Sequence, residues 1–318
     1  MSPTPLVAET REELARHLSG AHRERAAVSF VPTMGALHDG HARLMQVARK
    51  QGSGPVVVSI FVNPLQFGQG EDLDRYPRPL EEDLKVCERE GVDLVFVPRI
   101  EEVYPDGAST GSIDERGVTV EPGPLGNVLE GAVRPGHFRG VLTVVAKLLG
   151  LVQPQVAVFG EKDYQQLVLV RRMVRDLCLD VEIVGAETQR ESDGLALSSR
   201  NRYLDPEQRR RAVALSRALQ AARAAADGGP RAALDAARSE LDPATGIDLD
   251  YLVLTDPDLG DLPPQVPAGT QGRVLVAGRI GSTRLIDNLP ITFGPTSPGP
   301  AAGVPNADER SSRPEGDS

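Results

Sequence analysis

The segment FVPTMGALHDGHARLM, residues 30–45, joins an apolar strand to a helix and places two histidines at the junction. We expect the strand to end near Pro32 and the helix to begin near Gly40. His38 and His41 are three residues apart, so they lie on one face of a first helical turn. The free N–H groups and the positive dipole end of such a turn attract phosphate. Gly40, between the two histidines, fits this interpretation, because a side chain there would stand where the phosphates approach.

Two other interpretations of this histidine pair stay open from these residues alone. A histidine at the start of a helix more often caps or decorates that helix than it takes part in chemistry. A metal pair is disfavoured, because the chain has five histidines and no further ligand stands at a suitable spacing near His38 and His41. The rest of the sequence is needed to decide between these interpretations.

Strand–helix units repeat on both sides of this junction. Continuous apolar runs, typical of parallel strands covered on both faces, occur at residues 55–62, 92–98, 156–160 and 181–188. Amphipathic helical patterns occur at residues 10–25, with Thr10 as cap, and at 80–90, 138–152 and 164–177. Turns and one short strand at 118–120 are expected in the Gly/Pro-rich part between 104 and 126. We therefore predict an α/β fold with a Rossmann-like doubly wound parallel sheet, whose ligands bind beyond the carboxyl ends of the strands.

The character of the chain changes near residue 189, which predicts two domains and a tail. Residues 1–188 carry the strand–helix units. Residues 189–293 combine a long Ala/Arg helix, with Asp205 as cap and Pro206 in its first turn, with a second helix and three strands. This pattern predicts a smaller α+β domain. Residues 294–318 lack the apolar residues needed for a core, and we expect a disordered tail there.

Composition excludes several classes of protein. The formal net charge is −10, and no dense Lys/Arg run with interleaved aromatic residues predicts a nucleic-acid groove. No window approaches the roughly 18 apolar residues that a membrane helix needs, and the first residues lack the pattern of a secretory signal. We therefore expect a soluble, cytoplasmic protein that binds neither nucleic acid nor membrane. Cys87 and Cys178 have no CxxC partner and fit buried thiols.

Six motifs resemble those of the pantothenate synthetase (pantoate–β-alanine ligase) family, within the HxGH nucleotidyltransferase superfamily. They are PTMGALHDGH at 32–41, SIFVNPLQFG at 59–68, YPRPLEEDL at 76–84, RPGHFRGVLTVVAKL at 134–148, FGEKDYQQL at 159–167 and DGLALSSRNRYL at 193–204. The resemblance covers about residues 5–292. An HxGH motif alone is a weak signal, whereas six long motifs in the right order are specific.

The resemblance implies an ATP-dependent condensation of pantoate with β-alanine to pantothenate, with release of AMP and pyrophosphate through a pantoyl adenylate. It also implies Mg²⁺, a cytoplasmic homodimer and a place in coenzyme A biosynthesis. An alternative is a nucleotidyltransferase that moves AMP to a phosphate acceptor, but two glutamines in place of a basic acceptor pocket argue against it. A catalytically silent nucleotide-binding module would tolerate the loss of His41 or Lys162, and both residues are present.

The ATP site follows from the same resemblance. His41 is the residue usually given the proton-donor role, and His38 and Lys162 are the other catalytic candidates, as donors to the charge that develops on phosphate. The implied ATP-binding residues are Met34, Gly35, Ala36, Leu37, His38, Asp39, Gly40, His41, Gly160, Glu161, Lys162, Asp163, Gln189, Leu197, Ser198, Ser199 and Arg200.

The pantoate pocket calls for neutral amides, because the hydroxyls and carboxylate of pantoate need groups that both donate and accept. Gln66 and Gln166 match the pantoate-binding glutamines of the family, Gln66 is also expected near β-alanine, and Asn63 is a weaker candidate. The dimethyl group of pantoate calls for an apolar wall, for which the candidates are Pro32, Met34 and Phe67.

Two further groups of residues keep open roles. Glu81, Glu82 and Asp83 stand at a predicted helix start, where the dipole favours acids that have no function. Mg²⁺ usually binds substrate phosphates plus one or two carboxylates, so the metal ligand is unknown and Asp83 is one candidate. Arg134 and His137 are expected either to reach the active site or to fix a loop.

Overall fold

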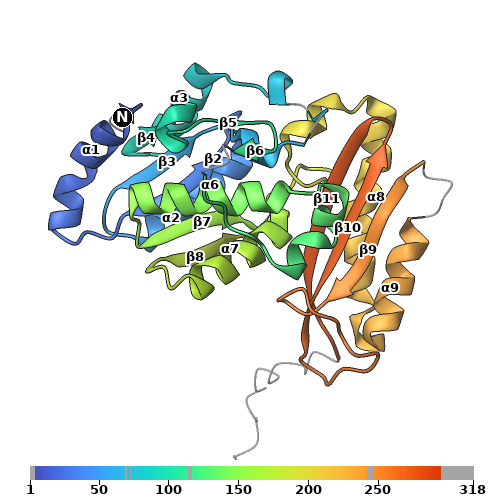
Figure 1. The fold of residues 1–318 in the computed structure, drawn as a ribbon. Helices are drawn as coiled ribbons and strands as arrows, with labels where there is room; N and C mark the ends of the chain where they lie inside the picture. The colour runs from blue at the N-terminus through green and yellow to red at the C-terminus, as the bar shows by residue number, and fades with distance from the viewer. Residues whose placement is uncertain (1–3, 69, 72, 114–116, 242–245, 295–318) are drawn as a thin grey trace, which may run out of the picture.

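The computed structural model describes residues 4–68, 70–71, 73–113, 117–241 and 246–294, and its larger part is built on a six-stranded parallel sheet (Figure 1). The strand order is β1-β4-β3-β2-β7-β8. These strands are β1 (Leu6–Ala8), β2 (Ser29–Thr33), β3 (Val56–Ile60), β4 (Leu94–Phe96), β7 (Val156–Gly160) and β8 (Glu182–Ala186). The predicted tail lies outside the described residues beyond Gly294.

The strand order reverses between β2 and β7, as in a doubly wound sheet. From β2 the chain moves outward to β3 and β4 on one side, then returns to β7 and β8 on the other. Phe30 of β2 is paired with Val57 of β3 and with Ala157 of β7. The predicted Rossmann-like fold is confirmed. In such sheets a crevice opens beyond the carboxyl ends of the two strands at the reversal, which here follow Thr33 and Gly160.

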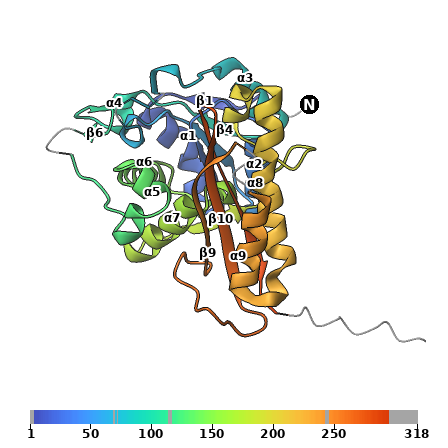
Figure 2. The same cartoon turned by 90° about the vertical axis from the view of Figure 1, so that its right-hand side faces the viewer.

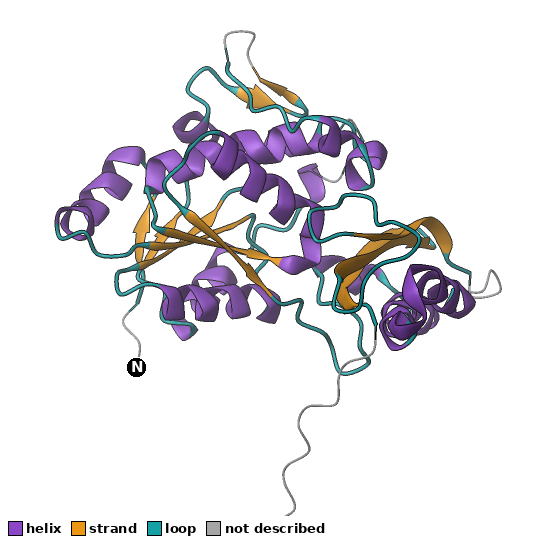
Figure 3. Ribbon diagram, turned by 90° about the horizontal axis from the view of Figure 1, so that it is seen from below, coloured by secondary structure: helices purple, strands orange, loops and turns teal. Residues whose placement is uncertain are grey.

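Helices cover both faces of this sheet (Figure 3). α1 (Arg11–Arg23), α6 (His137–Val152) and α7 (Tyr164–Asp176) share one apolar cluster with the sheet, and α2 (Asp39–Gln51) and α3 (Leu80–Arg89) share another. Neighbouring strand residues alternate between the clusters: Phe30 belongs to the first and Val31 to the second, and both are fully buried. Burial on two faces explains why the strands read as continuous apolar runs.

Helix ends follow their predicted caps. The hydroxyl of Thr10 accepts a hydrogen bond from the backbone N–H of Glu13, and the Glu13 carboxylate accepts one from the N–H of Thr10. Asp205 caps α8 (Pro206–Ala224) through the N–H groups of Glu207 and Gln208. Each cap satisfies donors that the first helical turn leaves free.

The C-terminal part packs two helices on a three-stranded antiparallel sheet of order β11-β10-β9 (Figure 2). Its elements are α8, α9 (Gly229–Glu240), β9 (Asp248–Thr255), β10 (Gln271–Ile280) and β11 (Thr283–Thr292). It has its own apolar cluster, which includes Leu215, Leu219 and Phe293. We keep the domain boundary between residues 188 and 189 as a proposal, since the parallel sheet ends at Ala186 and this cluster begins at Leu195.

Short elements connect the larger ones. They are α4 (Ile100–Val103), α5 (Glu130–Val133), the hairpin of β5 (Ala108–Ser109) and β6 (Ser112–Ile113), and the 3₁₀ turns η1 (Pro64–Gln66), η2 (Leu73–Arg75), η3 (Pro124–Asn127), η4 (Glu161–Asp163), η5 (Ser199–Tyr203) and η6 (Ala226–Gly228). None of the helices in the described parts of the chain combines the length and apolarity needed to cross a membrane.

Three local predictions were wrong or incomplete. Residues 118–120 form no strand; the N–H of Val120 donates to the hydroxyl of Thr143 instead of to a neighbouring strand. β1 was not predicted, because it has three residues and exposes Leu6 and Val7. Cys178 is exposed, since it follows the end of α7 with a positive φ of 53°, whereas Cys87 is buried as expected.

Candidate active site

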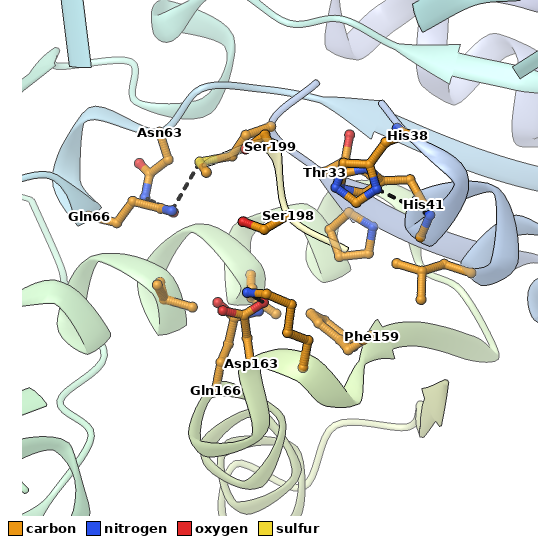
Figure 4. Close-up of a pocket in the computed structure, with 18 of the residues that line it drawn as sticks. Thr33, His38, His41, Asn63, Gln66, Phe159, Asp163, Gln166, Ser198 and Ser199 are labelled. Atoms are coloured by element: carbon orange, nitrogen blue, oxygen red, sulfur yellow. Dashed lines mark hydrogen bonds and ion pairs between the residues drawn. The ribbon is translucent and has the colours of Figure 1, made fainter. Parts of the chain in front are cut away.

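A cavity of about 270 Å³ opens at the reversal point of the parallel sheet (Figure 4). The side chains that line it come from the ends of β2, β7 and β8, from the segments that follow these strands and β3, and from α6 between His137 and Leu148. The predicted site residues on its wall are Met34, His38, Gly40, His41, Asn63, Gln66, Gly160, Lys162, Asp163, Gln166, Gln189, Leu197, Ser198, Ser199 and Arg200. Gly35, Ala36, Leu37, Asp39 and Glu161, which were also predicted, are not part of this wall. Residues distant in sequence thus form one site.

His38 and His41 both cap α2 through one ring nitrogen. Nδ1 of His38 accepts a hydrogen bond from the N–H of Gly40 at 3.1 Å, and Nδ1 of His41 accepts one from the N–H of His38 at 3.2 Å. An imidazole that accepts at Nδ1 carries its proton on Nε2 when neutral. The capping interpretation and the chemical one are therefore compatible, since each ring retains an Nε2–H donor.

Burial keeps both rings neutral. Burial, followed by the adjacent His38, lowers the pKa of His41 to about 3. The pKa of His38 is lowered by burial and by the positive charge of Lys162. The ring centroids are 4.2 Å apart, so two imidazolium ions there would repel each other. Around neutral pH this wall offers two uncharged N–H donors beside one ammonium group.

Gly40 has a steric role within the protein in addition to the one expected from the sequence. A Cβ at this position would lie 2.8 Å from Cε1 and 2.9 Å from Nδ1 of His38. The imidazole of His38 is thus a group that a substituent at position 40 would meet within the protein itself. Gly40 makes room for the ring that caps it.

Asp83 holds the turn before the histidines. Its carboxylate accepts hydrogen bonds from the N–H of Ala36 at 2.9 Å and of Leu37 at 2.7 Å, and the side chain is buried. Ala36 and Gly35 both have positive φ angles, 51° and 80°. Burial raises the pKa of Asp83 despite these two hydrogen bonds. These contacts give Asp83 a structural task, which is to hold the backbone of the turn.

Lys162 and Asp163 reach the cavity from the other side of the reversal. They lie in η4, directly after β7, and their charged groups are 3.8 Å apart. The Lys162 side chain is 19% exposed, whereas that of Asp163 is 54% exposed. A partly buried ammonium group beside two neutral imidazoles is suited to an anion.

An amide pair forms the wall next to Met34. The Asn63 amide donates to the carbonyl of Gly140 and to Oε1 of Gln66, both at 3.2 Å, and its oxygen accepts from the Tyr104 hydroxyl at 2.8 Å. Asn63 is 1% exposed, so its amide serves mainly to orient Gln66. The Gln66 amide lies 3.0 Å from the Met34 sulfur. Figure 4 shows Asn63 and Gln66 side by side on this wall.

The backbone carbonyl of Gln66 is also held by a cluster of His137, Arg134 and Glu71. Nδ1–H of His137 donates to the carbonyl of Gln66 at 2.8 Å, because Nε2 of that ring accepts from Arg134 at 3.1 Å. Arg134 forms a bidentate pair with Glu71, at 2.8 and 2.6 Å. Burial and Arg134 lower the pKa of His137 to about 4. Both predicted residues line the cavity, and the charge of Arg134 is neutralised there by Glu71.

The segment between the two sheets closes the cavity from the C-terminal side. Arg190 and Ala196 form an isolated antiparallel bridge, and the Leu197 N–H donates to the carbonyl of Gln189. Arg190 is anchored by Asp287 of β11 through two hydrogen bonds, at 2.6 and 3.0 Å. This small hairpin carries the three polar residues that follow Leu197 onto the cavity wall.

Tyr76 and Glu187 line the cavity although the sequence did not single them out. Tyr76 lies within the motif YPRPLEEDL, and its ring meets that of Phe67 edge-on at 6.0 Å. Glu187 follows β8, so its place at a strand end was the available signal. Among the described residues, no group of three or more His, Cys, Asp or Glu side chains could hold a metal ion.

Comparisons with known proteins agree on one family. A family model described as pantoate-β-alanine ligase matches residues 6–290. A pantothenate synthetase of a Nocardioides species is 64% identical over 311 residues, which are 96% of this chain and 91% of that protein. The pantothenate synthetase of Mycolicibacterium smegmatis is 58% identical over 267 residues, with 84% and 81% covered.

Two solved structures are similar over nearly their whole length. Pantothenate synthetase from Thermus thermophilus has a TM-score of 0.79 and 52% identity, covering 89% of this chain and 98% of that one. Pantoate-β-alanine ligase from Francisella tularensis, complexed with β-γ ATP and β-alanine, has a TM-score of 0.71 and 34% identity, covering 90% and 97%.

Proposed function

The chain belongs to the pantoate–β-alanine ligase family, ATP-dependent ligases that form pantothenate, and from this premise we propose which of its residues carry out the ligation. The observation that supports the assignment best is the placement of the two neutral imidazoles of His38 and His41 and the ammonium of Lys162 on one cavity at the sheet reversal. Phosphates are met at such a reversal by helix N-termini and by donors from the strand ends.

The reaction begins with activation of pantoate. A carboxylate oxygen of pantoate attacks the α-phosphorus of ATP, the bond from that phosphorus to the bridging oxygen breaks, and pyrophosphate leaves with the electron pair. Negative charge grows on the phosphoryl oxygens during this step. Nε2–H of His41 and His38 and the Lys162 ammonium are the donors for that charge, and their burial makes each hydrogen bond stronger than in water.

The second step consumes the pantoyl adenylate. The amine nitrogen of β-alanine attacks the acyl carbon, an amide bond forms, AMP leaves and the nitrogen loses a proton. Water would destroy the adenylate, so the site must exclude it. The hairpin of residues 189–197, tied to β11 through Arg190 and Asp287, covers the cavity on that side. We assign Ser198, Ser199 and Arg200 to the triphosphate, because this hairpin brings them onto the cavity wall.

Pantoate is assigned to the amide wall. Gln66 and Gln166 can donate to the carboxylate and accept from the hydroxyls of pantoate, and Pro32 and Met34 supply apolar surface beside them. Arg134, which donates to the Gln66 carbonyl at 3.3 Å, is paired with Glu71 at 2.6 Å. A phosphate acceptor would need an unpaired cation at this wall, so the pairing disfavours the alternative of AMP transfer to a phosphate.

Mg²⁺ is implied by the family resemblance, and the residues fit a cation that arrives on the triphosphate. Asp83 is a less suitable ligand than an exposed carboxylate, since each of its oxygens already accepts a backbone hydrogen bond. Asp163 and Glu187 are the carboxylates on the cavity wall, which matches the one or two that Mg²⁺ commonly takes beside phosphate oxygens. The chemistry that Mg²⁺ supplies there, when bound, is neutralisation of phosphate charge.

We extend the proposal to the assembly and its place in the cell. The family resemblance implies a homodimer in the cytoplasm. Sedimentation equilibrium of the purified chain measures its assembly directly, and a mass equal to one chain would contradict the proposed dimer.

The adenylate is tested by isotope exchange. Labelled pyrophosphate should enter ATP when pantoate is present and β-alanine is absent, because the first step is reversible without the second substrate. His41→Ala and Lys162→Ala should each lower the exchange rate by about tenfold or more while the chain still folds. His41→Ala should also be less stable, because it loses the hydrogen bond from the His38 N–H. Two results would contradict the two-step order: exchange that proceeds without pantoate, and no exchange by a chain that still releases AMP once β-alanine is added.

A further inference from the structure

Lys162 stands on a turn that has few means of fixing its own shape. η4 has three residues, and its N-cap position is Gly160, which offers no side chain and makes no capping hydrogen bond. The following helix α7 also begins without a side-chain cap. Any variation in the backbone of such a turn would displace the ammonium group at the end of the long, flexible lysine side chain.

Asn288 of the C-terminal sheet holds this turn from outside. Its side-chain amide donates one hydrogen bond to the carbonyl of Glu161 at 2.9 Å and another to the carbonyl of Lys162 at 2.8 Å. The two contacts join residues 127 and 126 positions apart. Asn288 is 3% exposed, so water does not compete for these hydrogen bonds.

Arg273 fixes the orientation of the Asn288 amide. Its Nε–H donates to Oδ1 of Asn288 at 2.8 Å, which leaves the amide N–H groups directed at the turn. Another N–H of Arg273 donates to the Glu161 carboxylate at 2.8 Å, and the guanidinium lies over the Tyr164 ring at 3.8 Å from its centroid. Arg273 thus clamps the residue before Lys162 and the first residue of α7.

We propose that Asn288, oriented by Arg273, is a positioning residue that sets the place of the Lys162 ammonium for adenylate formation. The proposal rests on the function proposed above for Lys162. It gives the C-terminal sheet a part in the first chemical step, because β10 and β11 contribute the two side chains that shape η4. Without the amide donors, Lys162 still enters the cavity but its ammonium group no longer holds one position. Its interaction with the α-phosphate in the transition state is then weaker.

Asn288→Asp is the variant that isolates this contact. It keeps the size of the side chain and the acceptor for Arg273, and replaces the two donors with an acceptor facing two carbonyls. The matched control is Tyr251→Phe, which removes a different hydrogen bond between the two domains, from the Tyr251 hydroxyl to Glu130 at 2.9 Å. Thermal unfolding of both variants reports what either change does to the fold.

The test is a double-mutant cycle with Lys162→Ala, read by pantoate-dependent pyrophosphate exchange. We expect Asn288→Asp to lower kcat for exchange by about tenfold while KM for pantoate changes by less than about twofold, and to cause no further loss in the Lys162→Ala background. Tyr251→Phe should leave exchange within about twofold of the parent chain. If Asn288→Asp does not fold, Asn288→Ser, which shortens the side chain and removes both amide N–H donors, enters the same cycle.

Three results would overturn the proposal. Normal exchange by Asn288→Asp would show that the turn keeps Lys162 in place unaided. Equal losses in both backgrounds would show that Asn288 supports the fold and not Lys162. Full exchange by Lys162→Ala would remove the proposed function of Lys162 together with this inference, and is distinguishable because it needs no change at Asn288.

Discussion

The backbone N–H of His38 donates to Nδ1 of His41, while Nδ1 of His38 itself accepts from Gly40 two residues on. Each histidine therefore uses Nδ1 to cap the start of α2 and leaves Nε2 for a ligand. This division makes the two roles separable by substitution, because an asparagine oxygen can take the place of Nδ1 but nothing in that side chain reaches as far as Nε2.

His38→Asn should keep the cap and lose the chemistry. Asparagine ranks with the best N-cap residues, so the free energy of unfolding should change by less than about 0.5 kcal/mol, while His38→Ala should lose about 1 kcal/mol. Pyrophosphate exchange should fall about tenfold or more in both variants, since each lacks the Nε2–H donor. Urea unfolding and exchange rates measure the two effects, and an Asn variant with normal exchange would show that His38 is a cap alone.

The lowered pKa values of two half-buried histidines predict a specific dependence of stability on pH. The pKa values of His41 and His137, about 3 and about 4, lie below the ordinary value of 6.5. The unfolded chain therefore binds more protons than the folded one below about pH 6.5. The stability that the neutral rings contribute is fully present above that pH and is lost as pH falls toward the folded pKa values, by on the order of 1 kcal/mol per pH unit for each ring.

Proton NMR tests this directly. The ring Cε1–H resonances assigned to His41 and His137 should not titrate between about pH 5 and 8, whereas those of histidines with ordinary pKa values shift near 6.5. Single substitutions of each histidine give the assignments. A His41 resonance that titrates near pH 6.5 would contradict the neutral ring on which its proposed role depends.

Patterns confined to one element were enough to predict the parallel sheet and most helices. Val56, Val57 and Val58 of β3 are all buried, although they point alternately to the two faces of the sheet. The continuous apolar sequence alone therefore indicates the strand. The short edge strand β1 lacks that signal, because Leu6 and Val7 are exposed. Secondary structure was thus predictable where burial leaves a periodic trace in the sequence.

The contacts that shape the site leave no such trace. Asp83 has the local features of any acid in a first helical turn, and its partners Ala36 and Leu37 are 47 and 46 residues away. Asn288 has no local feature that distinguishes it on a strand. Resemblance to a family pointed to the residues that meet the substrates, whereas the residues that hold them in place required the three-dimensional arrangement.

Asp83→Asn should damage the turn before the histidines and leave metal use unchanged. The new amide can accept one of the two backbone hydrogen bonds and would direct its own N–H groups at the other donor, at a cost of about 1–3 kcal/mol. Turnover should fall, while the Mg²⁺ concentration for half activation should stay the same. Glu82→Gln, an exposed neighbour, should change stability by less than about 0.5 kcal/mol. A large rise in the Mg²⁺ requirement of Asp83→Asn would restore Asp83 as a metal ligand.

The ion pair of Arg284 and Glu130 should be a main link between the two parts of the chain. Two hydrogen bonds of 2.7 and 2.6 Å join them, and the side chains are 15% and 12% exposed. Arg284→Met removes the cation that neutralises both Glu130 and Asp250 and leaves Glu130 with the hydrogen bond from Tyr251, which should cost about 3–5 kcal/mol. Adding Glu130→Leu should recover part of the loss in urea unfolding. A double variant as unstable as the sum of its parts would show that the two residues do not act as a pair.

Gly40→Ala should separate the need for space from the propensity of a helix. Both Gly40 and Gly150 are helical, and alanine is favoured over glycine inside a helix by about 1 kcal/mol. A Cβ at Gly150 would meet no atom within 4 Å, whereas one at Gly40 would lie 2.8 Å from the His38 ring. Gly150→Ala should therefore stabilise the chain and keep pyrophosphate exchange normal. Gly40→Ala should displace the His38 ring, forfeit the gain from helix propensity and lower exchange by about tenfold. Normal exchange by Gly40→Ala would mean that the His38 ring can move away from the added Cβ without losing its proposed role.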